Sequence, residues 1–206
     1  MTGTQRKCFW SGAFAIALLA GCATTDPRLT SRETQYLGAE QPAAVSRERG
    51  LPPWDKVSYW DGQALSGPAR VEIDLRAQRA YFYKNGKLAG VSTVSTGREG
   101  FNTPPGTFRI TQKNADHRSN LFGDYVDAAG NVVVKDVDAR KDPAPPGTKF
   151  LGAPMPNFMR FHGGIGMHAG YLPGYAASHG CVRLPAKMAQ HFFDNVSAGT
   201  PVTVVN

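Results

Sequence analysis

Residues 178–185 of this 206-residue chain read SHGCVRLP and place a cysteine directly after a His-Gly pair. A second histidine, His168, lies 13 residues before Cys181. A thiol is nucleophilic only as the thiolate, so a neighbouring base or cation has to lower its pKa from about 8.5. Because Gly180 has no Cβ, a substrate carbonyl could approach the backbone N–H groups beside the cysteine. The stretch predicts an acyl-transfer site with Cys181 as nucleophile and His168 as base.

The longer segment over residues 163–185, GGIGMHAGYLPGYAASHGCVRLP, resembles the catalytic signature of the L,D-transpeptidases. These YkuD-type bacterial enzymes act through a thiol on the peptide stems of peptidoglycan. Their signature is a histidine, a short spacer, Ser/Thr-His-Gly-Cys, an apolar residue and Asn or Arg. The positions are filled here by His168, Ser178, His179, Gly180, Cys181, Val182 and Arg183. Residues 94–110, VSTGREGFNTPPGTFRI, also resemble a strand, turn and strand of this family.

The resemblance implies a role for most residues of the segment. Cys181 attacks the stem carbonyl and forms a thioester, and His168 protonates the leaving amine before it acts as base toward the acceptor. The backbone carbonyl of Ala169 holds the imidazole in place. The oxyanion hole and its turn are expected from Ser178, His179 and Gly180.

Arg183 lies two residues after the nucleophile, and two roles are open for it. Its guanidinium can bind a free carboxylate of the substrate. Alternatively, it can form an ion pair that anchors the turn. The sequence does not choose between these roles.

The implied activity is the cross-linking of peptidoglycan stem peptides in cell-wall biogenesis, without a cofactor, by an enzyme that a carbapenem acylates. With water as the acceptor, the same site is an L,D-carboxypeptidase, and a hydrolase that releases wall proteins would use the same scaffold. A non-catalytic peptidoglycan-binding lipoprotein is the alternative outside the enzymes. Because a binding module has no reason to keep Cys181 beside His168, the sequence favours an enzyme.

Three histidines close to the cysteine raise the question of a zinc site. The conceivable ligands are His162, His168, His179 and Cys181. Their spacing matches no known type of zinc site, so we expect no metal here.

The first 22 residues are typical of a lipoprotein signal peptide. Arg6 and Lys7 precede an apolar run over residues 13–20, which is far shorter than the roughly 20 residues that span a bilayer. The run ends in Leu-Ala-Gly-Cys, and we expect signal peptidase II to cut before Cys22 and leave it lipidated. An ordinary secretory signal, which is the alternative, would leave Cys22 without a function.

Cysteine usage agrees with an oxidising compartment. Of three cysteines, Cys8 and Cys22 belong to the signal region, so the folded domain keeps Cys181 alone and forms no internal disulfide. A single thiol in the periplasm is exposed to oxidation, which favours a chemical role over a packing role. Because Ala23 rather than Asp follows the lipidated cysteine, we expect the periplasmic face of the outer membrane in a Gram-negative cell.

Composition divides the rest of the chain in two. Residues 23–66 are rich in Thr, Arg, Glu, Gln, Pro and Gly without apolar periodicity, which predicts a flexible tether. Its aromatic residues are the exception, and we expect Trp54, Tyr59 and Trp60 to pack as a short extension against the domain edge. Residues 67–206 are sufficient for one catalytic domain with its own core.

The pattern within that domain predicts a mainly β fold. Apolar residues alternate over 71–75, and two strand-like segments, 80–84 and 87–95, flank Asn85-Gly86, the strongest short hairpin signal. Further strands are expected at 107–111, 131–135, 165–168 and 201–205. Together with the resemblance, this pattern predicts an L,D-transpeptidase-like β-sandwich.

One C-terminal helix is expected after Pro185. Apolar residues recur every four positions from Leu184 to Val196, and Gly199 is a plausible stop. If this helix began just after Cys181, its positive end would favour the thiolate.

Residues 112–160 have weak patterning and include a proline-rich run over 143–146. Loops of such length are often functional lids, and the resemblance implies a capping loop over the substrate channel. The alternative is a surface excursion with one extra hairpin around 132–134. The sequence leaves both open.

The formal net charge is +7, or near +5 without Arg6 and Lys7 of the signal region. No basic run interleaved with aromatic residues occurs, so nucleic acid is a poor candidate as a partner. A moderately basic surface suits an anionic wall polymer and stem peptides that carry free carboxylates. We expect a monomer that is held at the outer membrane by its lipid.

Overall fold

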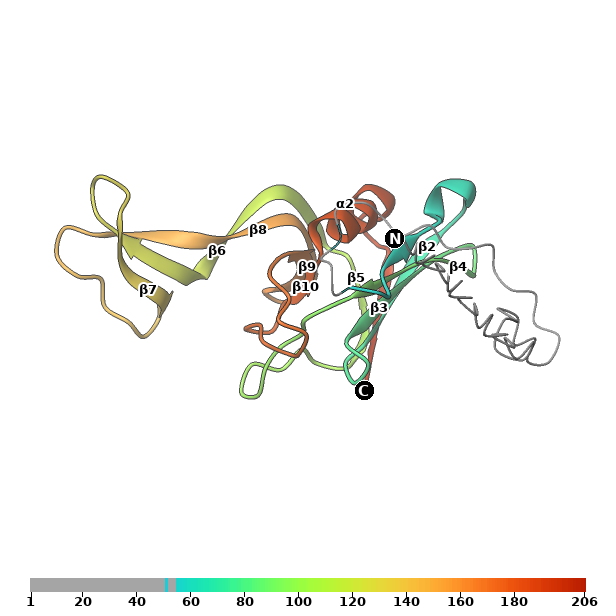
Figure 1. Cartoon of the computed structure of the whole chain (residues 1–206), viewed down its shortest axis with the longest axis horizontal. Coiled ribbons are helices and arrows are strands. Elements are labelled where there is room, and N and C mark those ends of the chain that lie inside the picture. Colours follow the sequence, from blue (N-terminus) through green and yellow to red (C-terminus); the bar gives the residue numbers. More distant parts are fainter. Residues whose placement is uncertain (1–50, 52–54) are drawn as a thin grey trace, which may run out of the picture. The chain divides into compact units, whose positions relative to one another are not determined.

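The computed structural model describes residue 51 and residues 55–206. The expected signal peptide, the lipidation site Cys22 and Trp54 lie outside the described residues. Within them, two β-sheets and one α-helix surround a common apolar core (Figure 1). This arrangement confirms the expected mainly β sandwich with a C-terminal helix. No helix in this part of the chain is long and apolar enough to cross a membrane.

The first sheet, sheet A, has six strands in the order β1-β4-β3-β2-β11-β5. Their bounds are β1 Tyr59–Trp60, β2 Ala69–Asp74, β3 Arg79–Lys84, β4 Lys87–Thr93, β5 Gly106–Arg109 and β11 Pro201–Val205. Between β3 and β4, Asn85 and Gly86 have positive φ angles of 47° and 75°, as a tight two-residue hairpin turn requires. The C-terminal strand β11 returns between β2, to which it is parallel, and β5, to which it is antiparallel.

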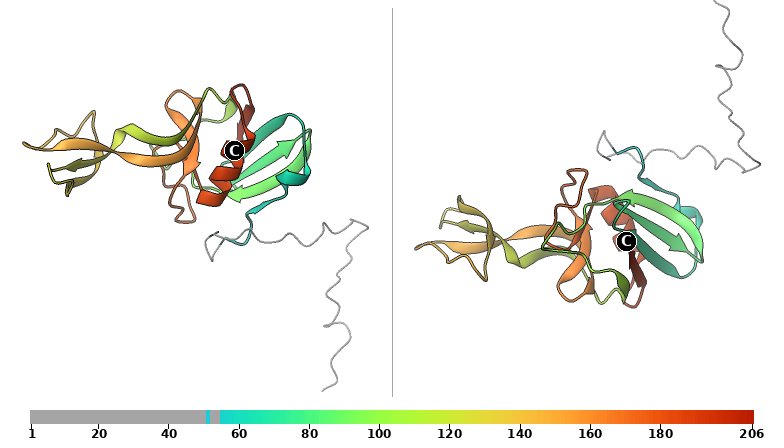
Figure 2. Two further views of the ribbon diagram at one scale, coloured as in Figure 1. Left: turned by 90° about the horizontal axis from the view of Figure 1, so that it is seen from above. Right: turned by 90° about the horizontal axis from the view of Figure 1, so that it is seen from below.

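The second sheet, sheet B, has five strands in the order β10-β9-β8-β6-β7. Their bounds are β6 Gln112–Val126, β7 Val132–Asp138, β8 Lys149–His162, β9 Ile165–Ala169 and β10 Val182–Leu184. The short strand β10 runs parallel to β9, and the other pairs are antiparallel. Strands β6 and β8 continue well beyond the part of sheet B that packs on the core and carry β7 at their far end (Figure 2).

Helix α2 spans Ala186–Asn195 and begins directly after Pro185, as expected. It buries Met188, Ala189 and Phe192 and packs against β8, β9 and β1. A short 3-10 helix, η1, spans Gly62–Ala64.

The folded domain begins before residue 67. Strand β1 pairs antiparallel with β4, and the Trp60 side chain is 6% exposed in the core. Its ring packs edge-on against Phe82 with the ring centroids 5.1 Å apart. The expected packing of Tyr59 and Trp60 on the domain edge is confirmed, and the tether predicted over 23–66 is too long at its C-terminal end.

A buried carboxylate fixes the entry of the chain into sheet A. Asp55 accepts hydrogen bonds from the backbone N–H groups of Val57 and Ser58, at 3.1 and 3.0 Å, and from Oγ1 of Thr93 at 2.8 Å. Burial raises the pKa of this carboxyl, but the hydrogen bonds together bring the pKa below its ordinary value. Residues 55–66 therefore belong to the domain.

The interval 112–160, for which the sequence left a capping loop and a surface excursion open, forms an antiparallel ribbon of two long strands, β6 and β8. The extra hairpin expected around 132–134 is present as β7. The sequence pattern misses the ribbon because a strand shows a period of two only where one face is buried. The first five residues of β6 are all exposed, and β8 contains Pro154 and Pro156.

A large bulge bends the ribbon. Between the pairs Arg118 with Pro154 and Gly123 with Gly152, five residue steps on β6 face two on β8. Residues 119–122 are unpaired in the β6–β8 ladder, although Phe122 still pairs with Asp138 of β7. A Cβ on Gly152 would collide with the Ser119 backbone carbonyl, so β8 needs a glycine at this position.

We predict that Trp60→Ala lowers the free energy of unfolding by about 3–5 kcal/mol, as expected for loss of a buried indole. Urea denaturation of the full chain measures this loss. Tyr59→Ala is the matched control on the same strand, because its half-buried side chain should cost clearly less. Equal losses at the two positions would contradict the assignment of β1 to the core.

Candidate active site

Successive side chains of the signature segment alternate between the two faces of sheet B, as in any β-strand. Val182 and Leu184 are fully buried in the core, so Cys181 and Arg183 point to the opposite face of sheet B. In the parallel ladder, Arg183 pairs with His168, which therefore lies on that same face.

A pocket of about 700 Å³ lies over this face of sheet B. It brings together the two predicted reactive residues, Cys181 and His168, with Arg183 beside them. The bulge residues 119–122 of the ribbon line it as well. The ribbon thus covers the pocket, which is the position expected of the capping element.

The thiol of Cys181 is half-buried and is the one free cysteine in the described part of the chain. Its Sγ lies 3.9 Å from the backbone oxygen of Gly164. Burial raises the pKa of the thiol, and a hydrogen bond from the Gly166 backbone and nearby arginines offset this effect only in part. The thiol is therefore protonated at neutral pH in the unliganded protein.

The helix N-terminus does not assist the thiolate. Helix α2 begins at Ala186, and strand β10 separates it from Cys181. Three strand residues carry the chain about 10 Å, whereas the field of a helix end falls off within its first turn. The helix therefore does not begin just after Cys181, and its positive end does not favour the thiolate as the sequence had suggested.

His168 is buried, with 6% of its surface exposed. Its Nδ1 lies 2.7 Å from the backbone oxygen of Ala169, which is the contact implied by the resemblance. Because a carbonyl only accepts, Nδ1 carries the proton and Nε2 is left as the basic atom. Burial lowers the pKa of His168 to about 4, although the hydrogen bond to Ala169 opposes this effect. The imidazole is neutral at pH 7.

Cys181 and His168 are thus both neutral in the unliganded protein. The raised pKa of the thiol and the lowered pKa of the imidazole share one cause, which is removal from water. A neutral imidazole can take the thiol proton as the sulfur attacks, so the site does not depend on a preformed thiolate.

Ser178 and Gly180 build the turn before the nucleophile. Buried Ser178 donates its hydroxyl to the Cys181 carbonyl and accepts the Gly180 N–H at 3.1 Å. Gly180 has φ 107°, a conformation that side chains disfavour, and its carbonyl accepts from Oγ1 of Thr103 at 2.8 Å. Because Ser178 occupies the Gly180 N–H, this group is not a free oxyanion donor.

The remaining donors of this turn are backbone groups. Within residue 51 and residues 55–206, the N–H groups of His179 and Cys181 have no hydrogen-bond acceptor. They are the candidates to hold an oxyanion next to the sulfur.

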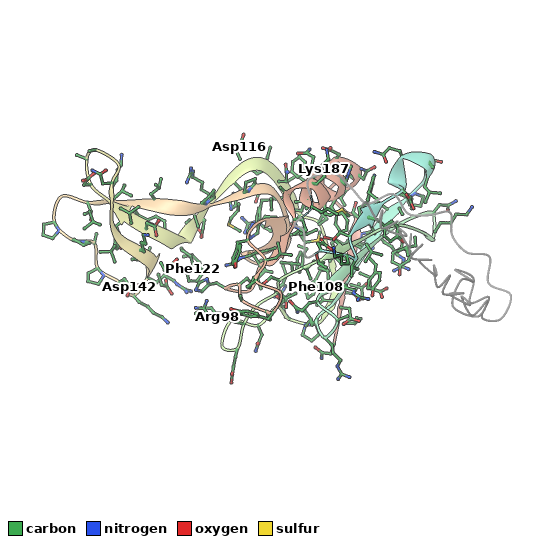
Figure 3. The ribbon with its side chains drawn as sticks, in the orientation of Figure 1. Arg98, Phe108, Asp116, Phe122, Asp142 and Lys187 are labelled. Atoms are coloured by element: carbon green, nitrogen blue, oxygen red, sulfur yellow. The ribbon has the colours of Figure 1, made fainter. Side chains whose placement is uncertain are left out.

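The side chain of His179 connects the turn to the ribbon. Its ring stacks on Phe122 with the centroids 4.2 Å apart and meets Phe101 edge-on at 4.8 Å. Its Nε2 accepts from Nη2 of Arg98 at 2.8 Å. Arg98 and Phe122, both labelled in Figure 3, reach this imidazole from two different segments. His179 therefore has structural contacts with Arg98, Phe101 and Phe122. The sequence did not predict these partners because they meet His179 only through the tertiary fold.

Arg183 is held through its backbone. Its N–H donates to the Ser95 carbonyl at 2.9 Å, and its carbonyl accepts the Ser95 N–H at 3.0 Å. Across the described residues, no carboxylate forms an ion pair with its guanidinium. The anchoring ion pair considered from the sequence is therefore not observed there.

The other histidines near the pocket differ in whether they line it. His162 packs against Phe108 with ring centroids 4.7 Å apart and does not line the pocket. His117, by contrast, lines the pocket and stacks on Phe158 at 4.2 Å. In the described part of the chain, no three His, Cys, Asp or Glu side chains are grouped so that they could hold a metal ion.

Comparison with known proteins gives a family match. Residues 68–204 match the family of the L,D-transpeptidase catalytic domain, YkuD. No curated protein matches the chain.

Several solved structures share the fold. An L,D-transpeptidase from Stackebrandtia nassauensis is 22% identical, with a TM-score of 0.50, over 68% of this chain and 56% of that one. An L,D-transpeptidase from Mycobacterium smegmatis is 22% identical, with a TM-score of 0.50, over 68% and 59%. The Ldtfm-avibactam carbamoyl enzyme is 25% identical, with a TM-score of 0.50, over 67% and 49%. The chain thus spans about half to three fifths of these proteins.

We predict that His168 makes stability depend on pH. The unfolded histidine titrates near pH 6.5 and the folded one near 4, so between these values the unfolded chain binds more protons. The free energy of unfolding should therefore fall by roughly 3 kcal/mol as the pH drops through this window, because one pKa unit is about 1.4 kcal/mol. Urea denaturation between pH 7 and pH 4 measures it.

His168→Gln should remove this part of the pH dependence. His162→Gln, which replaces an exposed histidine, should keep it. An unchanged pH slope in His168→Gln would contradict the buried neutral imidazole.

Proposed function

Because the chain belongs to the L,D-transpeptidase catalytic domain family, we propose that it is a thiol acyltransferase that cross-links peptidoglycan stem peptides. The observation that carries this proposal is the placement of Cys181 and His168 on one face of sheet B, in one pocket under the ribbon. The substrate and the acceptor are proposals as well.

In the first half-reaction, Cys181 attacks the carbonyl carbon between an L-centre, expected to be meso-diaminopimelate, and the following D-amino acid. Nε2 of His168 takes the thiol proton as the C–S bond forms, and the carbonyl oxygen becomes an oxyanion. The free N–H groups of His179 and Cys181 are suited to stabilise it. The C–N bond then breaks, His168 returns the proton to the leaving amine, and a thioester remains on Cys181.

In the second half-reaction, an amine of another stem attacks the thioester. His168 removes a proton from that amine and returns it to the sulfur as the C–S bond breaks, which regenerates the neutral pair. Water in place of the amine gives an L,D-carboxypeptidase. Because both acceptors use the same residues, the products and not the site distinguish the two activities.

Arg183 fits a substrate-binding role in this proposal. Its guanidinium lines the pocket, pairs in register with His168 and has no carboxylate partner among the described residues. Stem peptides carry free carboxylates that such a group binds through two parallel hydrogen bonds.

We predict that Cys181→Ala abolishes turnover of purified muropeptides by the full chain, with products identified by mass spectrometry. His168→Ala should lower the rate by at least about 10²-fold, because the proton transfers are lost. His162→Ala, outside the pocket, is the control and should stay active. Product formation by Cys181→Ala would refute the thiol mechanism.

The products decide between the candidate activities. New cross-links identify a transferase, shortened stems identify a hydrolase, and unchanged peptides with retained binding identify a non-catalytic module. A carbapenem provides a second readout, because intact-protein mass should show one adduct on the unmodified chain and none on Cys181→Ala. One similar solved structure is that of the Ldtfm-avibactam carbamoyl enzyme.

For the location, we propose lipid attachment at Cys22 and the periplasmic face of the outer membrane. This proposal is supported by the sequence of residues 1–22 alone. We predict that Cys22→Ser releases the protein into the soluble fraction or stalls its processing, and that it leaves the pocket chemistry unchanged. Cell fractionation and the N-terminal mass test this. Fully soluble wild-type protein without lipid would contradict it.

A further inference from the structure

The pocket over sheet B is lined by arginines without acids. Arg140, Arg160 and Arg183 line it, and no Asp or Glu does. The charge of Arg140 is compensated by Asp138, which accepts from its Nε at 2.9 Å and from its Nη2 at 2.7 Å. Among the described residues, neither of the other two arginines has an ion-pair partner. Two uncompensated cations therefore face one pocket.

Arg160 is fixed in place by neutral groups. Its Nε donates to Oε1 of Gln112 at 2.8 Å, and its Nη1 donates to the Gly163 carbonyl at 2.8 Å. The guanidinium lies 5.2 Å from the centroid of the Phe158 ring. A guanidinium has five N–H donors, so three remain for a ligand. Because the group is already oriented, it loses little freedom when it binds an anion.

The strand register aims Arg160 at the nucleophile. Arg160 on β8 pairs with Gly166 on β9, and Val182 on β10 pairs with Met167. One residue earlier in the same parallel register, Cys181 lies beside Gly166. Neighbouring strands are about 4.8 Å apart, so roughly 10 Å separate the Cα atoms of Arg160 and Cys181. Gly166 alone lies between them in the ladder, and the Phe158 ring packs on it, since a Cβ at Gly166 would lie 2.5 Å from Cε2 of Phe158.

Arg183 occupies the other side of the reactive pair. It lies in the next row of the sheet, beside His168. The two guanidinium groups thus flank the site from β8 and from β10, with the thiol and the imidazole between them. Both also lower the pKa of the Cys181 thiol in part, which places both charges within electrostatic reach of the sulfur.

We propose that Arg160 binds a free carboxylate of the acyl-donor stem peptide, across Gly166 from Cys181. This inference rests on the proposed function, because it assumes a peptide in the pocket. A donor stem offers two carboxylates near the scissile bond, one on its C-terminal D-residue and one on the side chain of its diamino acid. Either one suits three fixed N–H donors in a pocket without acids.

The test measures peptide binding without turnover. Isothermal titration calorimetry on the full chain carrying Cys181→Ala compares a synthetic tetrapeptide stem with two analogues, amidated at the C-terminus or at the diamino-acid side chain. The same titrations are repeated after adding Arg160→Gln, Arg160→Lys or Arg109→Gln. Arg109 is the matched control, since its guanidinium also donates to a backbone carbonyl, that of Gly199 at 2.9 Å, and lies outside the pocket.

Arg160→Gln should weaken binding of the free tetrapeptide about 10- to 100-fold, as for loss of charged hydrogen bonds. One of the two amidated analogues should bind the Cys181→Ala chain more weakly than the free tetrapeptide by a similar factor. For that analogue, the additional substitution Arg160→Gln should change the affinity little. That analogue identifies the carboxylate. Arg160→Lys should be intermediate, because it keeps the charge without the fork of donors. Arg109→Gln should have no effect.

The inference is overturned if Arg160→Gln weakens all three peptides equally, which is the signature of a merely structural role. It is also overturned if no peptide loses affinity, or if the free tetrapeptide does not bind the Cys181→Ala chain. Failure of the proposed function is a separate result, because the muropeptide turnover of the unmodified chain reports on it independently.

Discussion

The site depends on the burial of two apolar residues that alternate with two functional ones. Val182 and Leu184 are fully buried between the sheets, and a strand cannot bury them without turning Cys181 and Arg183 to the opposite face. Strand β10 is held in this register from both edges, by β9 on one side and by Ser95 on the other. The core therefore orients the nucleophile, and a shift by one residue would bury the thiol and expose the core.

Burial also determines the chemistry of the reactive pair. The same removal from water raises the pKa of Cys181 and lowers the pKa of His168 to about 4. The site is neutral without a ligand, and in the proposed mechanism charge develops only when the sulfur attacks a substrate carbonyl. The carbonyl of Ala169 fixes which imidazole nitrogen is basic. Such a site protects a single thiol from reactions of the free thiolate while it keeps the base in the correct protonation state.

The ribbon of β6 and β8 gives the pocket its roof and part of its charge. Its bulge over 119–122 covers the site, and Phe122 stacks on His179 next to the nucleophile. At the base of the same ribbon, Arg160 lies across Gly166 from Cys181. An arginine-lined pocket without acids, on a chain with net charge +7, is suited to an anionic peptide.

The sequence alone determined the family, the mainly β sandwich, the C-terminal helix and the candidate pair of Cys181 and His168, because these depend on local patterns and on a contiguous motif. Only the tertiary structure decided which long strands cover the pocket, that the Gly180 N–H is occupied, and that Arg160 faces the thiol. The physical reason is that these features arise from contacts between distant segments. Strands exposed on both faces have no periodic signal, and a residue 21 positions before the nucleophile becomes its neighbour only through the pairing of β8, β9 and β10.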